Sequence, residues 1–287
     1  SRMIPVAPDC RARGKLRAAG QWNAGTNSTG EDVSDILKIE REGTTAILTM
    51  NNPAKMNAFN SELRDLLTDA LEDLSVDSGC RAVILTGAGG NFSAGGDLKG
   101  FNEKTINQGR ARLRTGSSRL MRAMVRGAKP VIAAVEGYAV GAGMALPSAC
   151  DYVVASSAAK FSAGFMKIGF VPDLGMMWTL PRRVGLGRAK KLMALSNEIS
   201  AAEAERIGLV EEIAEPGKAL EAALKVAEKY AHIAPLAFEL LKDTLAEGLD
   251  EVLKAEIDMQ PILMLSEDHE EGKRAFFEKR KPKFTGR

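Results

Sequence analysis

Residues 91–98 read Asn-Phe-Ser-Ala-Gly-Gly-Asp-Leu, and residues 137–144 read Gly-Tyr-Ala-Val-Gly-Ala-Gly-Met. Each glycine-rich stretch follows a short apolar run typical of a buried strand, at 82–85 and at 131–135. One glycine pair after a strand indicates only a turn that accepts positive φ. Two such loops can bring backbone N–H groups to one point beside a sheet, and converging N–H donors form an oxyanion hole. The pair therefore predicts a site that stabilises a negatively charged oxygen.

Length and composition favour one large α/β domain with helices added to it. The chain has 287 residues, 45% of them hydrophobic, which is enough for a sizeable core. Its 39 basic and 37 acidic side chains nearly cancel, so no overall field attracts nucleic acid or an anionic membrane. Because only His232 and His269 are available, we expect neither a metal site nor a histidine-based catalytic triad.

The cysteines and the N-terminal stretch bear on the cellular compartment. Cys10, Cys80 and Cys150 are odd in number and follow no ligand spacing, which favours reduced thiols in a cytoplasmic protein. No apolar run approaches the roughly 18 residues that a membrane span needs. Residues 1–34 are basic and lack an apolar period, so we expect a disordered tail outside the fold. If this tail is part of an organellar presequence, the compartment is an organelle instead.

Between residues 36 and 162 the apolar pattern alternates between strands and helices. It first predicts a hairpin of strands at 36–40 and 45–50. It then predicts helices at 63–74 and 108–125 and a third helix that follows the second glycine loop and ends near Ala149. Further strands are predicted at 82–85, 131–135, 152–155 and 160–162. Either Asn60 or Ser61 can cap the first helix. Right-handed βα repeats stack into a parallel sheet with their functional loops at the carboxyl ends of the strands.

From residue 188 the pattern is mainly helical. It predicts helices at 188–195, 201–207, 220–230 and 236–245, two more through Lys279, and a last strand at 209–213. Pro261 lies inside one of these helices and is expected to kink or split it. The resulting division is a tail at 1–34, a core at 35–214 and a helical region at 215–287. Met259 and Met264 fall on apolar spacing and indicate core or subunit contacts.

Several motifs in register resemble the enoyl-CoA hydratase/isomerase (crotonase) superfamily. They are the two glycine loops, Ala-Cys-Asp-Tyr at 149–152 and Phe-Glu-Lys-Arg-Lys at 277–281, and the match runs from about Ile36 to Phe284. The resemblance implies a spiral of ββα repeats followed by a helical trimerisation region, assembled as a homotrimer or a dimer of trimers. It also implies acyl-CoA thioester substrates, with coenzyme A as part of the substrate and no permanently bound cofactor.

The resemblance assigns roles to residues of both loops. The thioester oxygen would lie between the N–H groups of Gly96 and Ala142, and each donor would stabilise an enolate by a few kcal/mol. Coenzyme A would be held by a further set of residues: Lys55, Met56, Ala58, Ala94, Asp97, Leu98, Phe277 and Lys281. Without the resemblance, Lys55 is simply a solvated lysine, and the C-terminal basic residues are a helix end that suits the helix dipole.

The chain departs from the family pattern where hydratases carry two glutamates. Alignment on the family places Ala145 at the first position and Phe165 at the second. Neither side chain can move a proton, so ordinary hydration of a double bond is disfavoured.

One acid remains, Asp173, in the run Phe-Val-Pro-Asp-Leu-Gly at 170–175. Its position resembles the aspartate of dienoyl-CoA isomerases and of phenylacetate-pathway isomerases. A single carboxylate in an apolar setting can take a proton from C2 of a 3-enoyl-CoA and return it at C4. Taken alone, Asp173 could instead cap the following helix. Asp151 is expected to form a structural bond rather than to act as a base.

Two alternatives to an isomerase remain open. Hydratase, dehydratase or hydrolase activity requires a second acid, and Glu103 is the nearby candidate. A non-enzymatic acyl-CoA-binding or RNA-binding member of the superfamily is less favoured, although the helix at 110–126 is rich in arginine. Its arginines fall on several faces, and no aromatic side chains alternate with them as stacking platforms would.

Overall fold

The computed structural model describes residues 35–101 and 103–287, and the expectation for residues 1–34 lies outside this range. Asp35–Arg287 forms one compact unit. The described strands are β1 (Leu37–Glu42), β2 (Thr45–Met50), β3 (Ala82–Gly87), β4 (Val131–Val135), β5 (Tyr138–Val140), β6 (Tyr152–Ser156), β7 (Lys160–Ser162), β8 (Ile199–Ser200) and β9 (Glu212–Ala214).

The described helices are α1 (Ser61–Val76), α2 (Ile106–Arg112), α3 (Ser118–Arg126), α4 (Ala142–Ala149), α5 (Met176–Val184), α6 (Leu186–Leu195), α7 (Ala201–Arg206), α8 (Ala219–Ala231), α9 (Pro235–Leu245), α10 (Leu249–Met264) and α11 (Glu267–Phe277). Asn60 caps α1 by accepting a hydrogen bond from the Leu63 N–H at 2.8 Å, as the sequence predicts.

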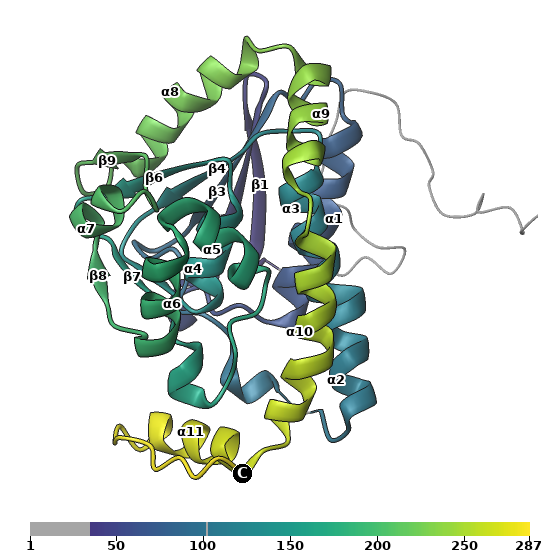
Figure 1. Ribbon diagram of the computed structural model, residues 1–287. Helices are drawn as coiled ribbons and strands as arrows, with labels where there is room; N and C mark the ends of the chain where they lie inside the picture. Colours follow the sequence, from purple (N-terminus) through teal and green to yellow (C-terminus); the bar gives the residue numbers. More distant parts are fainter. Residues whose placement is uncertain (1–34, 102) are drawn as a thin grey trace, which may run out of the picture. The chain divides into compact units, whose positions relative to one another are not determined.

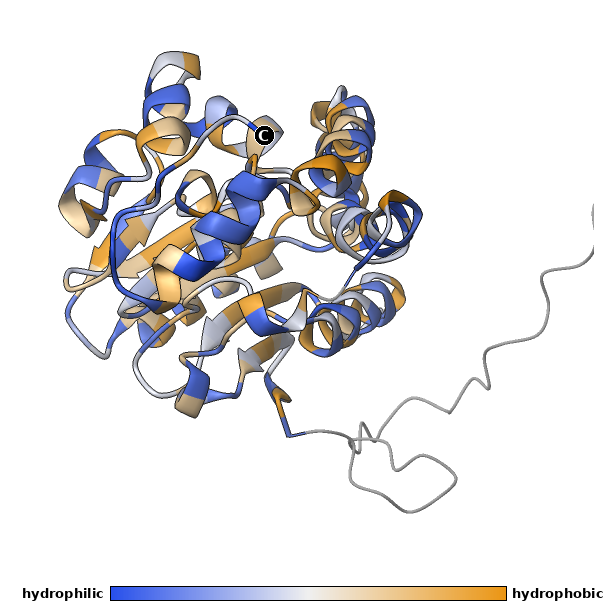
Figure 2. Ribbon diagram, turned by 90° about the horizontal axis from the view of Figure 1, so that it is seen from below, coloured by the Kyte–Doolittle hydropathy of each residue, from blue (hydrophilic) through white to orange (hydrophobic). Residues whose placement is uncertain are grey.

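A six-stranded sheet in the order β1-β2-β3-β4-β6-β9 forms the centre of the fold. Only β1 is antiparallel to its neighbour, and the register places Leu48 opposite Leu85 and Leu85 opposite Ala133. A second sheet has the order β5-β7-β8, and its first strand is formed by residues 138–140 of the second glycine loop. In Figure 2 the strands are predominantly hydrophobic, while the helices carry both colours.

The period of two along each strand divides the apolar residues between two cores. Leu48 and Leu85 point to the side that holds α1, α3 and α4, whereas Ile47 and Ile84 point to α8. α8 therefore covers one face of the central sheet, although the expected boundary at 215 assigns it to a separate helical region. The C-terminal helices that do not pack on this face of the sheet are α9, α10 and α11 (Figure 1).

Pro261 does not split its helix, contrary to expectation. α10 runs unbroken from Leu249 to Met264, with the proline inside. The proline ring packs against Gly109 of α2, where a Cβ would lie 2.8 Å from Pro261 Cβ. The long helix at 108–125 does change character, because a π-helical turn, η3 (Leu113–Ser117), joins α2 to α3.

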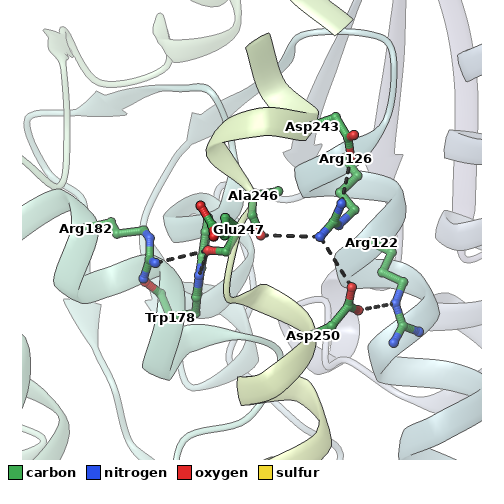
Figure 3. Close-up of polar contacts among 8 residues, drawn as sticks. All are labelled: Arg122, Arg126, Trp178, Arg182, Asp243, Ala246, Glu247 and Asp250. Carbon is green, nitrogen blue, oxygen red and sulfur yellow. Dashed lines mark hydrogen bonds and ion pairs between the residues drawn. The ribbon is translucent and has the colours of Figure 1, made fainter. Parts of the chain in front are cut away.

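Polar contacts fasten α3 and α5 to the segment between α9 and α10 (Figure 3). Arg126 Nη1 pairs with Asp243 at 2.7 Å and Arg122 Nε with Asp250 at 2.7 Å. On the other side Trp178 Nε1 donates to the Glu247 carbonyl at 3.1 Å. These contacts fix where α10 begins, and α10 in turn supports the candidate site.

Candidate active site

The two glycine loops meet edge to edge, as the sequence predicts. Val140 N–H donates to the Ser93 carbonyl at 3.0 Å, and Ser93 N–H donates to the Tyr138 carbonyl at 2.9 Å. Gly95 has φ of +97°, and a Cβ there would lie 2.6 Å from the Val140 carbonyl oxygen. Only glycine fits at this position, because any side chain would force the loops apart.

Two backbone N–H groups are left for a ligand where the loops meet. Among the described residues, none accepts a hydrogen bond from the N–H of Gly96 or of Ala142. Ala142 is the first residue of α4, so its N–H has no partner inside the helix and carries part of the positive helix dipole. Both residues line one cavity, which is the arrangement that an oxyanion hole requires.

The cavity has a volume of about 340 Å³ and is mainly apolar. Its apolar lining includes Phe59, Leu98, Phe101, Phe165, Ile168, Phe170, Leu174 and Phe276, and its ionisable lining consists of Arg64, Asp97, Glu103, Arg112 and Asp173. The cavity is large enough for a small acyl group together with the thioester that carries it.

Asp173 lies in the wall of this cavity with 9% of its surface exposed. Burial raises the pKa of its carboxyl, while the Arg112 charge and a hydrogen bond from Gln260 Nε2, at 3.2 Å, oppose the rise. The next residue, Leu174, has φ of +53°, a conformation that costs a branched residue about 1 kcal/mol or more. The packing of this loop therefore holds a carboxylate that is poised to accept a proton.

Asp173 does not cap the helix that follows it. The N-cap of α5 is Gly175, and no side chain caps it. The Gly175 N–H instead donates to both carboxyl oxygens of Glu256, at 3.1 and 3.2 Å. Burial raises the pKa of Glu256 well above its usual range, and the charge of Asp173 adds to the rise. α10 thus supports the Asp173 loop through two side chains four residues apart, Glu256 and Gln260.

Ala145 and Phe165 are both buried, and Phe165 lies in the cavity wall. Glu103 also lines the cavity, where its Oε1 lies 2.8 Å from Arg112 Nε. The other oxygen, Oε2, is buried without a hydrogen-bond partner among the described residues. Asp151 is structural, as expected, since its Oδ2 accepts from Val131 N–H at 2.7 Å and from Lys242 at 2.8 Å.

The residues predicted to hold coenzyme A lie in several places. Ala94, Asp97 and Leu98 line the cavity, and Lys55 pairs with Asp97 at 3.5 Å on the surface beside it. Met56 and Ala58 belong to the same segment as Lys55, which Asn57 anchors by donating to the carbonyls of Ala88 and Asn91. The predicted coenzyme A segment therefore borders the first glycine loop.

The C-terminal candidates lie elsewhere. Phe277 is 52% exposed and Lys281 is also exposed, and neither is among the residues that line the cavity. The neighbouring Phe276 does line it, and α11 is held to this wall by His269, whose ring stacks on Phe170. Sequence reasoning missed Phe276, Arg64, Glu256 and Gln260, because nothing local shows which face of α1, α10 or α11 meets the cavity.

The arginines of α2 and α3 are largely engaged in ion pairs. Within residues 35–101 and 103–287 their acidic partners are Glu103 and side chains of α1, α9 and α10. Arg114 lies in η3, between the two helices, and has no acidic partner among these residues. Paired guanidinium groups are poorly placed to bind phosphates, which disfavours the RNA-binding alternative. The described residues also include no group of three or more metal-ligating side chains, and no described helix is long and apolar enough to cross a bilayer.

Comparison with known proteins places these features in a family context. Residues 40–287 match the sequence model described as enoyl-CoA hydratase/isomerase. The short-chain-enoyl-CoA hydratase of Clostridium acetobutylicum is 36% identical over 248 residues, 85% of this chain and 95% of that protein. The 1,2-epoxyphenylacetyl-CoA isomerase of Escherichia coli is 35% identical, over 84% of this chain and 94% of that protein.

The fold is confirmed by solved structures. An enoyl-CoA hydratase from Mycobacterium avium subsp. paratuberculosis superposes with a TM-score of 0.78 at 31% identity, and the match covers 87% of this chain and 98% of the other. The predicted α/β spiral with C-terminal helices is therefore correct.

Proposed function

Because the chain belongs to the enoyl-CoA hydratase/isomerase family, we propose that it moves a double bond of an acyl-CoA thioester from the 3,4 to the 2,3 position. The observation that carries this proposal is the position of Asp173, a buried carboxylate in the same cavity as the free N–H groups of Gly96 and Ala142. The resemblance to the family aligns Ala145 and Phe165 with the two glutamates of its hydratases, which supports a reaction that adds no water.

The proposed reaction needs one proton and no water. Asp173 takes a proton from C2 of a 3-enoyl-CoA, and the electron pair moves into a dienolate whose oxygen accepts from Gly96 and Ala142. The same proton then returns at C4, which leaves the double bond between C2 and C3 and restores the carboxylate. The raised pKa of Asp173 suits both steps, because it makes the carboxylate a stronger base than an exposed aspartate and leaves the acid able to return the proton.

A second candidate function, hydration of a 2-enoyl-CoA, is favoured by Glu103. Glu103 and Asp173 are the two carboxyl groups of the lining besides Asp97, and a pair of carboxyl groups is what holding and ionising a water requires. The names of the relatives support a hydratase at least as well as an isomerase. Direct comparison of the two reactions decides between them.

Other parts of the proposed function concern binding and assembly. Lys55, Met56, Ala58, Ala94, Asp97 and Leu98 would hold coenzyme A, with Phe277 and Lys281 contributing from a neighbouring subunit. No permanently bound cofactor is proposed. Exposed leucines on α9 support a homotrimer or a dimer of trimers, and the buried free thiols of Cys80 and Cys150 support a cytoplasmic location.

The test measures isomerisation of 3-hexenoyl-CoA and hydration of crotonyl-CoA by the wild type, Asp173→Asn and Glu103→Gln. We expect isomerisation to dominate in the wild type and to fall by about 10²- to 10⁴-fold in Asp173→Asn, because the amide cannot carry the proton. Glu103→Gln is the matched control and should retain isomerisation. Hydration that exceeds isomerisation and is lost in both variants would establish the hydratase instead.

A further inference from the structure

Arg64 is a buried cation in the cavity wall that the proposed chemistry does not use. It lies in the second turn of α1, lines the cavity and is 7% exposed. Its Nε and Nη2 share one oxygen of Asp65, at 3.0 and 2.9 Å. No described residue accepts a hydrogen bond from Nη1, so one edge of the guanidinium retains unused donors.

The structure around Arg64 is built to leave room for the guanidinium. A Cβ on Gly116 would lie 2.2 Å from Arg64 Cζ and 2.6 Å from Nη1, so the group rests directly on the backbone of η3. η3 is the π-helical turn between α2 and α3, and single π turns inside helices frequently mark functional sites. The next residue, Ser117, also lines the cavity.

Of the two arginines in the cavity lining, Arg64 is the one whose acidic partner is largely exposed. Arg112, the other cavity arginine, is paired with Glu103 at 2.8 Å. Asp65 engages only one edge of Arg64, and its own side chain is 56% exposed. An arginine stays charged when buried, and a buried charge with incomplete pairing costs free energy unless a ligand completes it.

We propose that Arg64 binds a carboxylate on the acyl chain, so that the substrate class is acyl-CoA thioesters of dicarboxylic acids. The guanidinium edge matches a carboxylate in shape and charge, whereas a purely apolar acyl chain would leave the same donors desolvated. This inference depends on the proposed function in one respect: the thioester is taken to bind at Gly96 and Ala142. A phosphate of coenzyme A offers similar acceptor oxygens, and the test separates the two sources.

Calorimetric binding of saturated ligands tests the inference without any turnover. Adipyl-CoA, hexanoyl-CoA and free coenzyme A are titrated into the wild type, Arg64→Met, Arg64→Lys and Gly116→Ala. Arg119→Met is the matched control, since Arg119 of α3 also pairs with acids of α1 but lies outside the cavity lining. Thermal unfolding of each variant checks that it is folded.

The wild type is expected to bind adipyl-CoA more tightly than hexanoyl-CoA. Arg64→Met should weaken adipyl-CoA binding by about ten- to a hundredfold and leave hexanoyl-CoA unchanged, as loss of a charge-assisted hydrogen bond predicts. Gly116→Ala should lose the same preference because it displaces the guanidinium, and Arg64→Lys should retain part of it. An equal loss for all three ligands would assign Arg64 to a coenzyme A phosphate. A wild type that prefers hexanoyl-CoA would overturn the proposal, whatever the role of Asp173.

Discussion

At the scale of the residue, Asp173 illustrates how a site can oppose stability. An aspartate that is almost fully buried has lost most of its hydration, and its only hydrogen-bond donor among the described side chains is Gln260. Its pKa is raised mainly by burial, so the ionised form is less favourable in the folded chain than in the unfolded one. Leu174 beside it adds backbone strain. The buried carboxylate and the strained backbone therefore lower the free energy of unfolding.

Asp173→Asn should stabilise the protein at neutral pH and not in acid. The folded pKa lies above the unfolded value, so the wild type loses stability as pH rises from about 4 through the folded pKa, while the amide does not titrate. The gain in melting temperature of the variant should grow over this window and then stay level. Melting curves of both proteins between pH 4 and 9 check this, with Asp151→Asn, which breaks a structural ion pair, as the destabilising contrast. A variant gain that is largest at pH 4 would contradict the direction of the pKa shift.

Residue identity alone predicts part of this site. Gly95, Gly96, Ala142 and Asp173 belong to local motifs whose backbone geometry follows from glycine and from strand endings, and the structure brings them to one cavity. Arg64 and Gln260 were not predicted, because a residue on a helix reaches a site only through packing that the local pattern does not encode. The phosphate contacts expected of Lys55 also stay a prediction.

At the scale of the element, α10 is the support of the Asp173 loop. Glu256 and Gln260 lie four residues apart and hence on one face of the helix, where they meet Gly175 and Asp173. The sequence predicts this helix but not the direction of its polar face. Pro261 was expected to kink or split it, and the helix is not split there. Glu256 and Gln260 therefore belong to one continuous helix that contacts the Asp173 loop.

Removal of the Gln260 amide should shift the pH dependence of catalysis. Gln260 donates to the carboxylate of Asp173 and so lowers its pKa, which means that Gln260→Leu should raise it. The acid limb of kcat/KM for 3-hexenoyl-CoA is expected to move to higher pH, because a hydrogen bond that favours the ionised carboxyl is lost. Met259→Leu, on the adjacent and partly exposed position, is the control. An acid limb that stays in place in Gln260→Leu would show that the amide does not position the base.

At the scale of the whole molecule, α9 presents an apolar surface that residues 35–101 and 103–287 do not cover. Leu236, Leu240, Leu241 and Leu245 are each between 52% and 66% exposed, although they belong to one helix of eleven residues. Figure 1 places α9 beside α3 at the edge of the fold. Scattered exposed leucines need no explanation, but a cluster of four on one helix is typical of a surface that meets another subunit.

If the proposed homotrimer forms, the leucines of α9 should hold it together. Wild-type protein at micromolar concentration is expected to sediment with three or six times the mass of the chain. Leu240→Glu with Leu245→Glu places two charges on the apolar surface and should yield monomers, because burying unpaired carboxylates costs several kcal/mol. Leu186→Glu, at the exposed first residue of α6, which Figure 1 shows well separated from α9, is the control and should leave the mass unchanged. A wild type that sediments as a monomer would contradict the assembly.

If the double variant is monomeric, its kcat/KM for 3-hexenoyl-CoA shows whether the neighbouring subunit contributes to the site. An unchanged kcat/KM would exclude the proposed contribution of Phe277 and Lys281 across the interface.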